Sequence, residues 1–397
     1  MNKKISLGAA ICFMAIAAAA SFVITMYYSL NIFNSKMANV TEREELYSKL
    51  AEIDKLVRSN FLGDIDEEAL KDSIADGYIK GLGDPYSVYM TQEEYRQYQQ
   101  RNAGELIGIG VSAMLDNSGY LLVTAVSSGS PAEAAGLQKD DLLIKIDGKD
   151  VLAMGYDDAS EAIQGEDGTV VSLVYRRAGE ETTVDITRKR VKDSGVVYRV
   201  MDGGIGYVKL GGFNATTPSN FKYAVEDLIS QNVSGLVFDV RGNSGGLVSS
   251  VAEILDYLLP AGDLISQTNH KRETTVLYTS DADFIDLPMM CLIDGDTASA
   301  GELFACDLRD FRAAELVGVT TYGKGVLQTA FPLEDGSAIS ATTAYYNPHS
   351  GVNFQGVGVK PDYEVTLTAE QKQNLASLDE HTDPQLMKAI SVLQAAK

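Results

Sequence analysis

The chain has 397 residues, of which 45% are hydrophobic, and its formal net charge at pH 7 is −22. This length is sufficient for two or three domains with ordinary hydrophobic cores. The negative charge argues against nucleic-acid binding, which needs basic patches, and against broad contact with an anionic membrane surface. The three scattered cysteines predict neither a disulfide framework nor a metal site, and we expect no metal and no other cofactor.

The N-terminal segment, residues 1–36, is predicted to anchor the chain in a cell membrane. Lys3 and Lys4 precede an uncharged, largely apolar stretch that covers residues 5–33. A membrane span needs about 20 residues, whereas the apolar part of a secretion signal has only about 7–15. We therefore favour an uncleaved single-pass anchor, with cleavage near residues 17–21 as the alternative. In both cases the lysines stay in the cytoplasm and the rest of the chain is extracytoplasmic.

Residues 37–103 are predicted to be helical. Apolar residues recur at helical spacing in a first helix, and a second helix covers about residues 67–82. The segment Gly-Asp-Pro-Tyr-Ser at residues 83–87 then ends this helix. Composition alone fits a helical hairpin, a propeptide or a dimerisation arm, so a second copy of the chain is among the candidate partners.

Residues 104–190 are predicted to form a β-rich domain. The string Ser-Pro-Ala-x-x-Ala-Gly-Leu-x-x-x-Asp-x-Leu occupies residues 130–143 and resembles bacterial PDZ modules. A tight Asp-Gly turn follows at residues 147–148. The predicted strands lie at about residues 106–110, 120–126, 140–148, 169–176 and 181–188, with a helical turn at 129–137 and a short helix near 157–164.

The PDZ resemblance implies a peptide-binding groove. Such a module adds an extended peptide to an exposed sheet edge and holds the terminal carboxylate with backbone N–H groups. The carboxylate loop is expected near residues 106–108, and the peptide-pairing strand at about residues 109–113. The candidate peptide-binding residues are Leu106, Ile107, Gly108, Ile109, Gly110 and Val111.

Residues 191–365 alternate strand and helix, which predicts an α/β core. A buried apolar strand is expected at residues 235–239. The glycine-rich loop after it, at residues 241–246, lacks the spacing of phosphate-binding loops, so we expect no nucleotide site. Residues 366–397 are expected to be a polar helical tail that serves as a lid or a dimer contact. Further predicted elements are strands at 206–210 and 337–346 and helices at 217–230 and 247–259.

Ser299 is predicted to lie at a turn between an apolar strand at residues 289–293 and a helix at residues 303–311. The free N–H groups of a helix start can stabilise an oxyanion there, although a serine at this position is more often only a helix cap. Lys324 lies between two glycines at the start of another strand, on which Gln328 would face the same side. The chain has three histidines and none lies in a Ser-His signature, so lysine is the expected base.

Two motifs resemble the active-site motifs of the carboxy-terminal processing peptidases, which are tail-specific serine proteases with a Ser-Lys dyad. They are Asp-Gly-Asp-Thr-Ala-Ser-Ala-Gly-Glu at residues 294–302 and Thr-Tyr-Gly-Lys-Gly-Val-Leu-Gln at residues 321–328. The resemblance implies Ser299 as nucleophile, Lys324 as general base and Gln328 as the amide that orients the lysine. Three flanking positions depart from the family pattern, namely Asp296, Thr297 and Gly301.

The resemblance covers nearly the whole chain. Residues 84–89 match a D-P-Y-S-x-Y motif that ends the helical segment of the family. Residues 239–246 match a loop whose glycine amide joins the oxyanion hole, which implies Gly245 or Gly246 together with the N–H of Ala300. The implied fold class is α/β multidomain, with an N-terminal helical segment, a PDZ-like β-rich domain and an α/β peptidase core of the ClpP/crotonase-like type.

The sequence therefore predicts a membrane-anchored serine endopeptidase that binds unfolded or tail-exposed proteins through its PDZ domain and cleaves them. A neutral lysine base requires desolvation, so Lys324 should be buried, and pairing with Asp296 or Glu302 would argue against the dyad. We expect tail binding in the PDZ groove to gate the site. Gln164 replaces an arginine that often ends the PDZ helix in this family, so a relay through that arginine is altered or absent. The alternatives are a catalytically silent PDZ adaptor and an acyl-thioester hydrolase, and the PDZ domain disfavours the latter.

Overall fold

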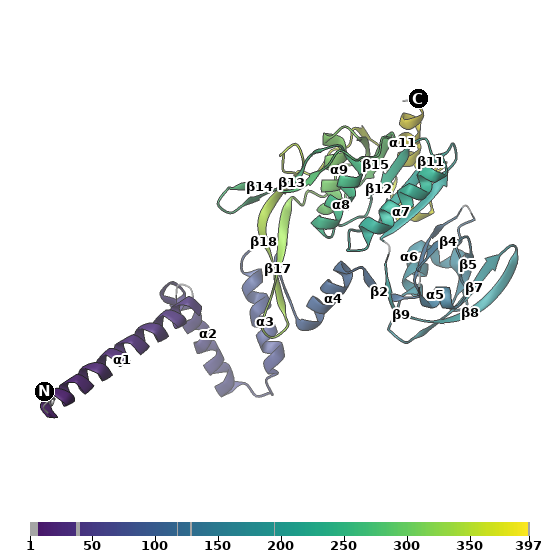
Figure 1. The fold of residues 1–397 in the computed structure, drawn as a ribbon. Helices are drawn as coiled ribbons and strands as arrows, with labels where there is room; N and C mark the ends of the chain where they lie inside the picture. Colours follow the sequence, from purple (N-terminus) through teal and green to yellow (C-terminus); the bar gives the residue numbers. More distant parts are fainter. Residues whose placement is uncertain (1–6, 37–39, 117, 128, 194, 396–397) are drawn as a thin grey trace, which may run out of the picture. The chain divides into compact units, whose positions relative to one another are not determined.

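The computed structural model describes residues 7–36, 40–116, 118–127, 129–193 and 195–395 (Figure 1). The chain divides into two compact units, Met1–Lys71 and Asp72–Lys397. The predicted fold class is confirmed, because a helical N-terminal part, a β-rich domain and an α/β core are all present. The helices of the N-terminal part are α1 (Leu7–Lys36), α2 (Val40–Asn60), α3 (Glu67–Lys80) and α4 (Gln92–Asn102).

Helix α1 contains the apolar stretch that the sequence predicts. Its part Cys12–Leu30 is long and apolar enough to cross a membrane, and a secretion signal would meet the same criteria. Lys3 and Lys4, on which the predicted orientation depends, lie outside the described residues. The structure therefore supports a helix of spanning length and leaves the sidedness a prediction.

The PDZ domain has a sheet with the strand order β3-β4-β5-β7-β8, in which β3 is an edge strand. Its core contains Val123, Leu143 and Leu173, which are fully buried. Helix α6 begins earlier than predicted and is kinked at Gly155, whose φ is 75°. The elements are β2 (Glu105–Gly108), β3 (Val111–Leu115), β4 (Leu121–Val126), α5 (Pro131–Ala134), β5 (Leu142–Ile146), β6 (Lys149–Asp150), α6 (Val151–Ile163), β7 (Val170–Arg177), β8 (Glu180–Thr187) and β9 (Lys189–Lys192).

A central sheet with the order β10-β11-β12-β15-β16-β19 organises the peptidase core. Neighbouring strands are parallel except β10, which is antiparallel to β11. Parallel sheets are covered on both faces, which is why β12 and β15 are apolar and completely buried. The elements are β10 (Val196–Met201), β11 (Ile205–Leu210), α7 (Thr217–Ser230), β12 (Leu236–Asp239), α8 (Val248–Leu258), β15 (Met289–Ile293), α9 (Ala300–Asp310), β16 (Ala314–Gly318), β19 (Tyr363–Glu364), α10 (Ala369–Gln373) and α11 (Pro384–Ala395).

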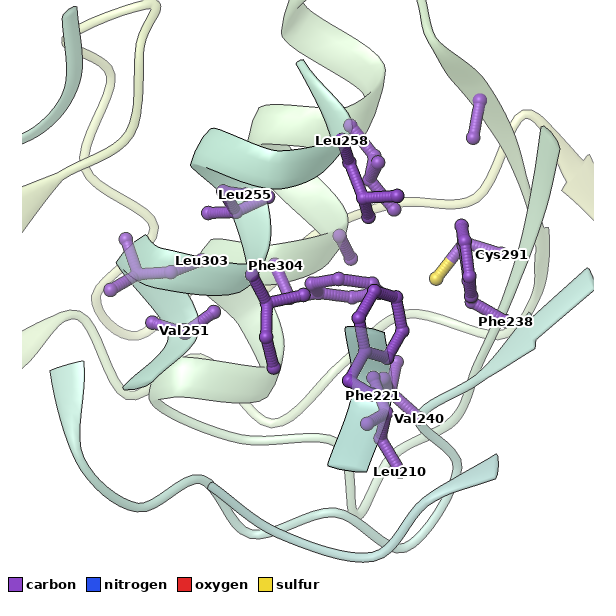
Figure 2. Packing of buried hydrophobic residues seen from close by; sticks show 14 of the residues in the cluster. Leu210, Phe221, Phe238, Val240, Val251, Leu255, Leu258, Cys291, Leu303 and Phe304 are labelled. Atoms are coloured by element: carbon purple, nitrogen blue, oxygen red, sulfur yellow. The ribbon is translucent and has the colours of Figure 1, made fainter. Parts of the chain in front are cut away.

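Alternate side chains of the buried strands enter two different hydrophobic cores. Figure 2 shows the larger core, in which Phe238 of β12 packs with Phe221 of α7 and Phe304 of α9. Val237, the preceding residue of β12, belongs to a second core together with Leu386 of α11. Helices α7, α8 and α9 therefore cover one face of the sheet, and α11 covers the other.

The expectation of a polar C-terminal tail is wrong for α11. Leu386, Ala389 and Leu393 are buried among residues of the central sheet. The buried guanidinium of Arg241 also contacts Asp383, at 2.7 Å, just before this helix. The last helix is thus an integral part of the peptidase core.

Leu386→Ala is expected to lower the free energy of unfolding by about 2–5 kcal/mol, the usual effect of truncating a buried leucine. Thermal or denaturant unfolding measures this effect. The matched control is Met387→Ala, because Met387 is the next residue of the same helix and is 47% exposed. If both variants unfold like the parent, α11 does not pack on the sheet.

A second sheet carries two segments of the active site. Its long hairpin, β17 (Val326–Pro332) and β18 (Ala338–Asn347), is paired along β18 with β1 (Val88–Met90) and with the hairpin β13 (Gly262–Asn269) and β14 (Thr274–Ser280). Lys324 lies just before β17, and Tyr346 lies near the end of β18.

Candidate active site

Ser299 lies between β15 and the first residue of α9, at the turn that the sequence predicts. Its backbone has φ 57° and ψ −119°, a conformation that residues with a side chain rarely adopt. Such strain persists only where the surrounding structure enforces it, and it is common at functional sites. The residue is 9% exposed, so its hydroxyl lies in a nearly closed environment.

Ser299→Gly is expected to raise the melting temperature relative to Ser299→Ala, because glycine adopts this backbone without strain. The strain is worth about 1–3 kcal/mol, and the greater flexibility of glycine in the unfolded chain offsets about 0.5–1 kcal/mol of it. Both variants lack the hydroxyl, so thermal unfolding rather than activity is the measurement. A glycine variant that melts no higher than the alanine variant would show that the turn is unstrained.

The carboxylate of Glu302 joins the two candidate catalytic segments. It is fully buried, and its Oε2 accepts hydrogen bonds from the backbone N–H groups of Ser299, at 2.9 Å, and Lys324, at 2.8 Å. Its Oε1 accepts from the backbone N–H of Gly323, at 2.7 Å, and from the hydroxyl of Thr321. A carboxylate offers about four acceptor positions. All of them are used to hold the serine turn beside the lysine loop.

The ammonium group of Lys324 lies over the aromatic ring of Tyr86, 5.2 Å from the ring centroid. Burial lowers the pKa of Lys324, while the nearby carboxylates of Asp84 and Glu302 act in the opposite direction. Within the described residues Lys324 forms no ion pair, and Asp296 is exposed to solvent. The carboxylate pairing that would argue against a lysine base is therefore not seen in this part of the chain.

The phenol of Tyr346 contacts both the serine turn and the lysine loop. Its phenolic oxygen is 2.8 Å from Ser299 Oγ and 2.7 Å from the carbonyl oxygen of Lys324. The residue is 1% exposed, and burial raises the pKa of its phenol. In this arrangement the hydroxyl of Ser299 is bonded to Tyr346 rather than to the Lys324 amine.

The structure does not bring Gln328 to the lysine amine by the geometry that we expected. Lys324 precedes β17 instead of lying on it, so the alternation of a strand does not relate its side chain to that of Gln328. The amide of Gln328 donates to Val326 O and to Thr342 Oγ1, each at 3.3 Å. The argument from strand alternation is wrong, and the role of Gln328 stays a prediction.

The glycine loop before α8 lies against the serine turn. A Cβ at Gly245 would be 2.8 Å from Ser299 Cβ and 3.0 Å from the Ala300 nitrogen. The N–H of Gly245 donates to Asn243 Oδ1 at 2.8 Å and is therefore occupied. Across the described part of the chain, no hydrogen-bond partner is seen for the N–H of Gly246 or Ala300. Both residues are chain neighbours of this contact, since Gly246 follows Gly245 and Ala300 follows Ser299.

The predicted peptide-binding residues of the PDZ domain are divided between two strands. Residues 105–108 form β2, which pairs with β9, and residues 111–115 form β3 at the edge of the main sheet. Gly110, between them, has a φ of 83°, and a Cβ there would be 2.4 Å from Ser130 Cβ. A cavity of about 330 Å³ is lined by residues 108–113 together with Ile163 and Gln164. Leu106 also lines this cavity, whereas Ile107 is not among its lining residues, so five of the six predicted residues share one groove.

Three residues of the site had no predicted role, namely Tyr346, Tyr86 and Asp84. Asp84 and Tyr86 belong to the motif at residues 84–89, and Tyr346 ends the strand predicted at residues 337–346. Neither segment is close to Ser299 in the sequence. Ser87 fixes the Asp84 segment to the second sheet, because its Oγ donates to Asp84 Oδ2 and accepts from the N–H of Thr342 at 3.1 Å. The Asp84 segment comes close to the site because β1 pairs with β18, and the sequence alone did not indicate this pairing.

Comparison with known proteins finds similarity to proteases along most of the chain. Residues 204–365 match the model of peptidase family S41, residues 122–177 match a PDZ domain, and residues 5–94 match the activating protease CtpB N-terminal domain. The carboxy-terminal-processing protease of Bartonella bacilliformis is 32% identical over 365 residues, which cover 88% of this chain and 83% of that protein.

Two further similarities extend over most of the chain. A protein of Staphylococcus aureus strain COL, named as a CtpA-like serine protease, is 29% identical over 340 residues, which cover 85% of this chain and 68% of that protein. A solved structure from Bacteroides fragilis, described as an S41 protease, has a TM-score of 0.51 at 18% identity and covers 81% of this chain and 90% of that one. The latter similarity shows the fold alone.

Proposed function

Because the chain belongs to the carboxy-terminal-processing proteases of peptidase family S41, we propose that it is a serine endopeptidase with Ser299 as nucleophile and Lys324 as general base. The observation that carries this proposal is the buried carboxylate of Glu302, which binds the backbone of both residues. A serine that served only as a helix cap would not require its turn to be bonded to a lysine loop. The strained backbone of Ser299 supports the same assignment.

In the proposed reaction, neutral Lys324 removes the proton from Ser299 Oγ while this oxygen bonds to the carbonyl carbon of the scissile peptide. The protonated lysine then donates to the leaving amine. A water molecule that is deprotonated by Lys324 hydrolyses the acyl-enzyme and releases the serine. The Lys324 amine lies over the ring of Tyr86 and, among the described residues, has no hydrogen bond to Ser299 Oγ, so it has to come within hydrogen-bond distance of that oxygen for the first step. Gln328 stays a candidate for orienting the amine in that second position.

The N–H groups of Gly246 and Ala300 are the proposed oxyanion-hole donors. Gly245 is disfavoured because its N–H already donates to Asn243 Oδ1. A side chain at position 246 would lie 2.1 Å from the carbonyl oxygen of Phe213, so only glycine fits this loop. Donors that are fixed before the reaction stabilise developing negative charge most effectively.

Asp84→Asn is expected to shift the acid limb of the kcat/KM profile to lower pH. Burial lowers the pKa of Lys324, and the Asp84 carboxylate raises it against this effect. Removing that carboxylate lowers the lysine pKa further, so the neutral amine is populated at a lower pH. The measurement is the pH dependence of peptide cleavage by the parent and the variant.

Asp296→Asn is the matched control for this shift. Asp296 is only three positions before the nucleophile in sequence, but it is exposed and does not affect the pKa of Lys324. The acid limb of the kcat/KM profile of Asp296→Asn should coincide with that of the parent. An unchanged limb in Asp84→Asn, or a limb moved to higher pH, would contradict the assignment of Lys324 as the titrating base.

We further propose that the PDZ groove binds the C-terminal tail of a substrate and that this binding gates the site. The position of β3 at the edge of its sheet and the cavity lined by residues 108–113 support strand addition and carboxylate binding. Among the described residues no hydrogen bond joins the Lys324 amine to Ser299 Oγ, which supports a second, active arrangement. Gln164 lines the groove at the position where relatives often carry arginine, so a relay through that arginine is not part of this proposal.

Gating is tested by adding a short uncleavable peptide with a free, apolar C-terminus while an unrelated peptide is cleaved. The proposal expects faster cleavage when the tail peptide is present. The same peptide with an amidated C-terminus is the control, because it lacks the carboxylate. Equal rates with both peptides would remove the gating role, and inhibition by both would indicate simple competition at the active site.

The proposed location is the cell membrane, with α1 as a single-pass anchor and the catalytic domain outside the cytoplasm. The length and apolarity of Cys12–Leu30 support this location, as does the net charge, which suits a soluble exported domain. Membrane fractionation and N-terminal sequencing of the mature protein test it. A soluble protein that begins after α1 would show a cleaved signal instead.

The peptidase function is tested with the full chain in detergent and an unfolded protein that ends in small apolar residues. The parent should cleave it, and Ser299→Ala and Lys324→Ala should not. A substrate that ends in charged residues is the control for tail selection. Tight binding of the apolar tail without cleavage by the parent would favour a PDZ adaptor over an enzyme.

A further inference from the structure

We propose that Tyr346 is a positioning residue that holds Ser299 Oγ and ties it to the backbone of the base. This inference rests on the proposed function of Ser299 and Lys324. The phenolic oxygen of Tyr346 lies 2.8 Å from Ser299 Oγ and 2.7 Å from the carbonyl oxygen of Lys324. One rigid side chain therefore contacts both members of the dyad.

The directions of the two hydrogen bonds follow from elementary chemistry. The carbonyl oxygen of Lys324 can only accept, so the phenol of Tyr346 donates its single proton to it. Ser299 must then donate its hydroxyl proton to the phenolic oxygen. Burial raises the pKa of the phenol, so Tyr346 remains protonated and is not a base. It fixes the hydroxyl and leaves proton abstraction to Lys324.

The phenol itself is held in place from several sides. The backbone carbonyls of Tyr346 and Gly325 both accept from the side-chain amide of Asn353, at 2.6 and 2.7 Å. The ring packs against Phe354 with centroids 5.8 Å apart, and the residue is 1% exposed. A side chain with so little freedom defines where the Ser299 oxygen lies.

Positioning is needed because a serine hydroxyl is otherwise free to rotate. The Cα–Cβ bond has three staggered minima, and only some of them direct Oγ toward a substrate carbonyl. The bond to Tyr346 selects one of them before the substrate arrives. When the Lys324 amine approaches, the Ser299 proton turns from the phenol to the amine while the oxygen stays in place. Losing the phenol should slow attack by Oγ without weakening substrate binding.

The test compares Tyr346→Phe with the parent in peptide cleavage and in labelling of Ser299 by a small fluorophosphonate. Labelling forms an Oγ–P bond with loss of fluoride and does not need the PDZ groove. We expect kcat and the labelling rate to fall by about 10- to 100-fold, since small misplacements of reacting groups have effects of this size, with KM unchanged. The acid limb of the pH profile should stay at the parent position, because Lys324 remains the base.

Tyr207→Phe is the matched control. Tyr207 is another buried tyrosine of the peptidase core, and its phenol donates to Asp239 Oδ2 at 2.7 Å. Its loss removes a comparable buried hydrogen bond, so both variants should lose similar thermal stability, but only Tyr346→Phe should slow labelling. If Tyr346→Phe does not fold, Phe354→Leu loosens the packing of the phenol and should also slow labelling, less strongly.

The outcomes separate this inference from the proposed function. If the parent is labelled at Ser299 and Tyr346→Phe reacts at the same rate, Tyr346 is only a packing residue and the inference fails. If the parent is neither labelled nor active, the proposed function itself fails. A rise in KM with an unchanged kcat would place Tyr346 in substrate binding and would also overturn the inference.

Discussion

Replacing Lys324 by methionine is expected to lower kcat by about 10²–10⁴-fold or more, the usual contribution of a general base. The Ser299 hydroxyl would keep its bond to Tyr346, but this phenol stays protonated because burial raises its pKa, so it cannot take over the role of the base. Methionine retains the apolar stem of the lysine. It also removes an ammonium group whose charge is disfavoured by burial, so the melting temperature should not fall.

Lys222→Met is the matched control for this replacement. The Lys222 ammonium also lies over an aromatic ring, 5.5 Å from the centroid of Tyr257, on a helix of the same domain. It should retain the activity and stability of the parent. A Lys324→Met variant that still cleaves at a substantial rate would exclude lysine as the base, whereas lost activity with a lower melting temperature would show that Lys324 is structural.

Glu302→Gln is expected to disrupt the site and to lower the free energy of unfolding by about 2–6 kcal/mol. The amide group of glutamine donates where a carboxylate oxygen accepted, so two of the four donors around Glu302 lose their partner. A buried polar group without a partner costs about 1–3 kcal/mol. If the amide nitrogen takes the place of Oε1, the donors of Thr321 and Gly323 lose their partner. If it takes the place of Oε2, the backbone N–H groups of Ser299 and Lys324 lose theirs.

Activity of Glu302→Gln should fall together with stability, because the carboxylate holds the serine turn beside the lysine loop. Glu253→Gln, on the exposed side of α8, is the control and should change stability by no more than about 0.5 kcal/mol. Denaturant unfolding and peptide cleavage measure the two effects. A stable variant with full activity would mean that the connection through Glu302 is not needed for catalysis.

Much of the nucleophile region was predictable from local patterns. The apolar run of residues 289–293 and the helical periodicity after Ser299 locate the serine at a strand-to-helix turn. The PDZ domain was recognisable from a string of small and apolar residues. The short helix predicted near residues 157–164 corresponds to the part of α6 after the kink at Gly155, and the helical part before the kink was not predicted.

The partners of the two catalytic side chains were not predictable in the same way. Tyr346 and Tyr86 contact Ser299 and Lys324 only because β18 pairs with β1 and β17, and periodicity within a segment carries no information about such pairing. The position of Gln328 was misjudged because Lys324 lies in an irregular segment before β17 and not on the strand itself. No sequence pattern predicted that irregularity.

Some elements outside the site were also not predictable from patterns within a single segment. The hairpin β13–β14 is rich in polar residues, so it lacked the apolar alternation of a half-buried strand. Its strands are stabilised by cross-strand pairing instead. Helix α11 was judged together with the more polar residues before it, yet the helix itself is mostly apolar, and Leu386 and Leu393 pack on the sheet.

The most direct test of the central claim is to locate the fluorophosphonate adduct by peptide mass mapping in the parent and in Lys324→Met. If Lys324 activates Ser299, the parent carries the adduct on Ser299, and the variant carries little or none under the same conditions. An adduct on another residue, or equal labelling of Ser299 in both proteins, would contradict a Ser299–Lys324 dyad.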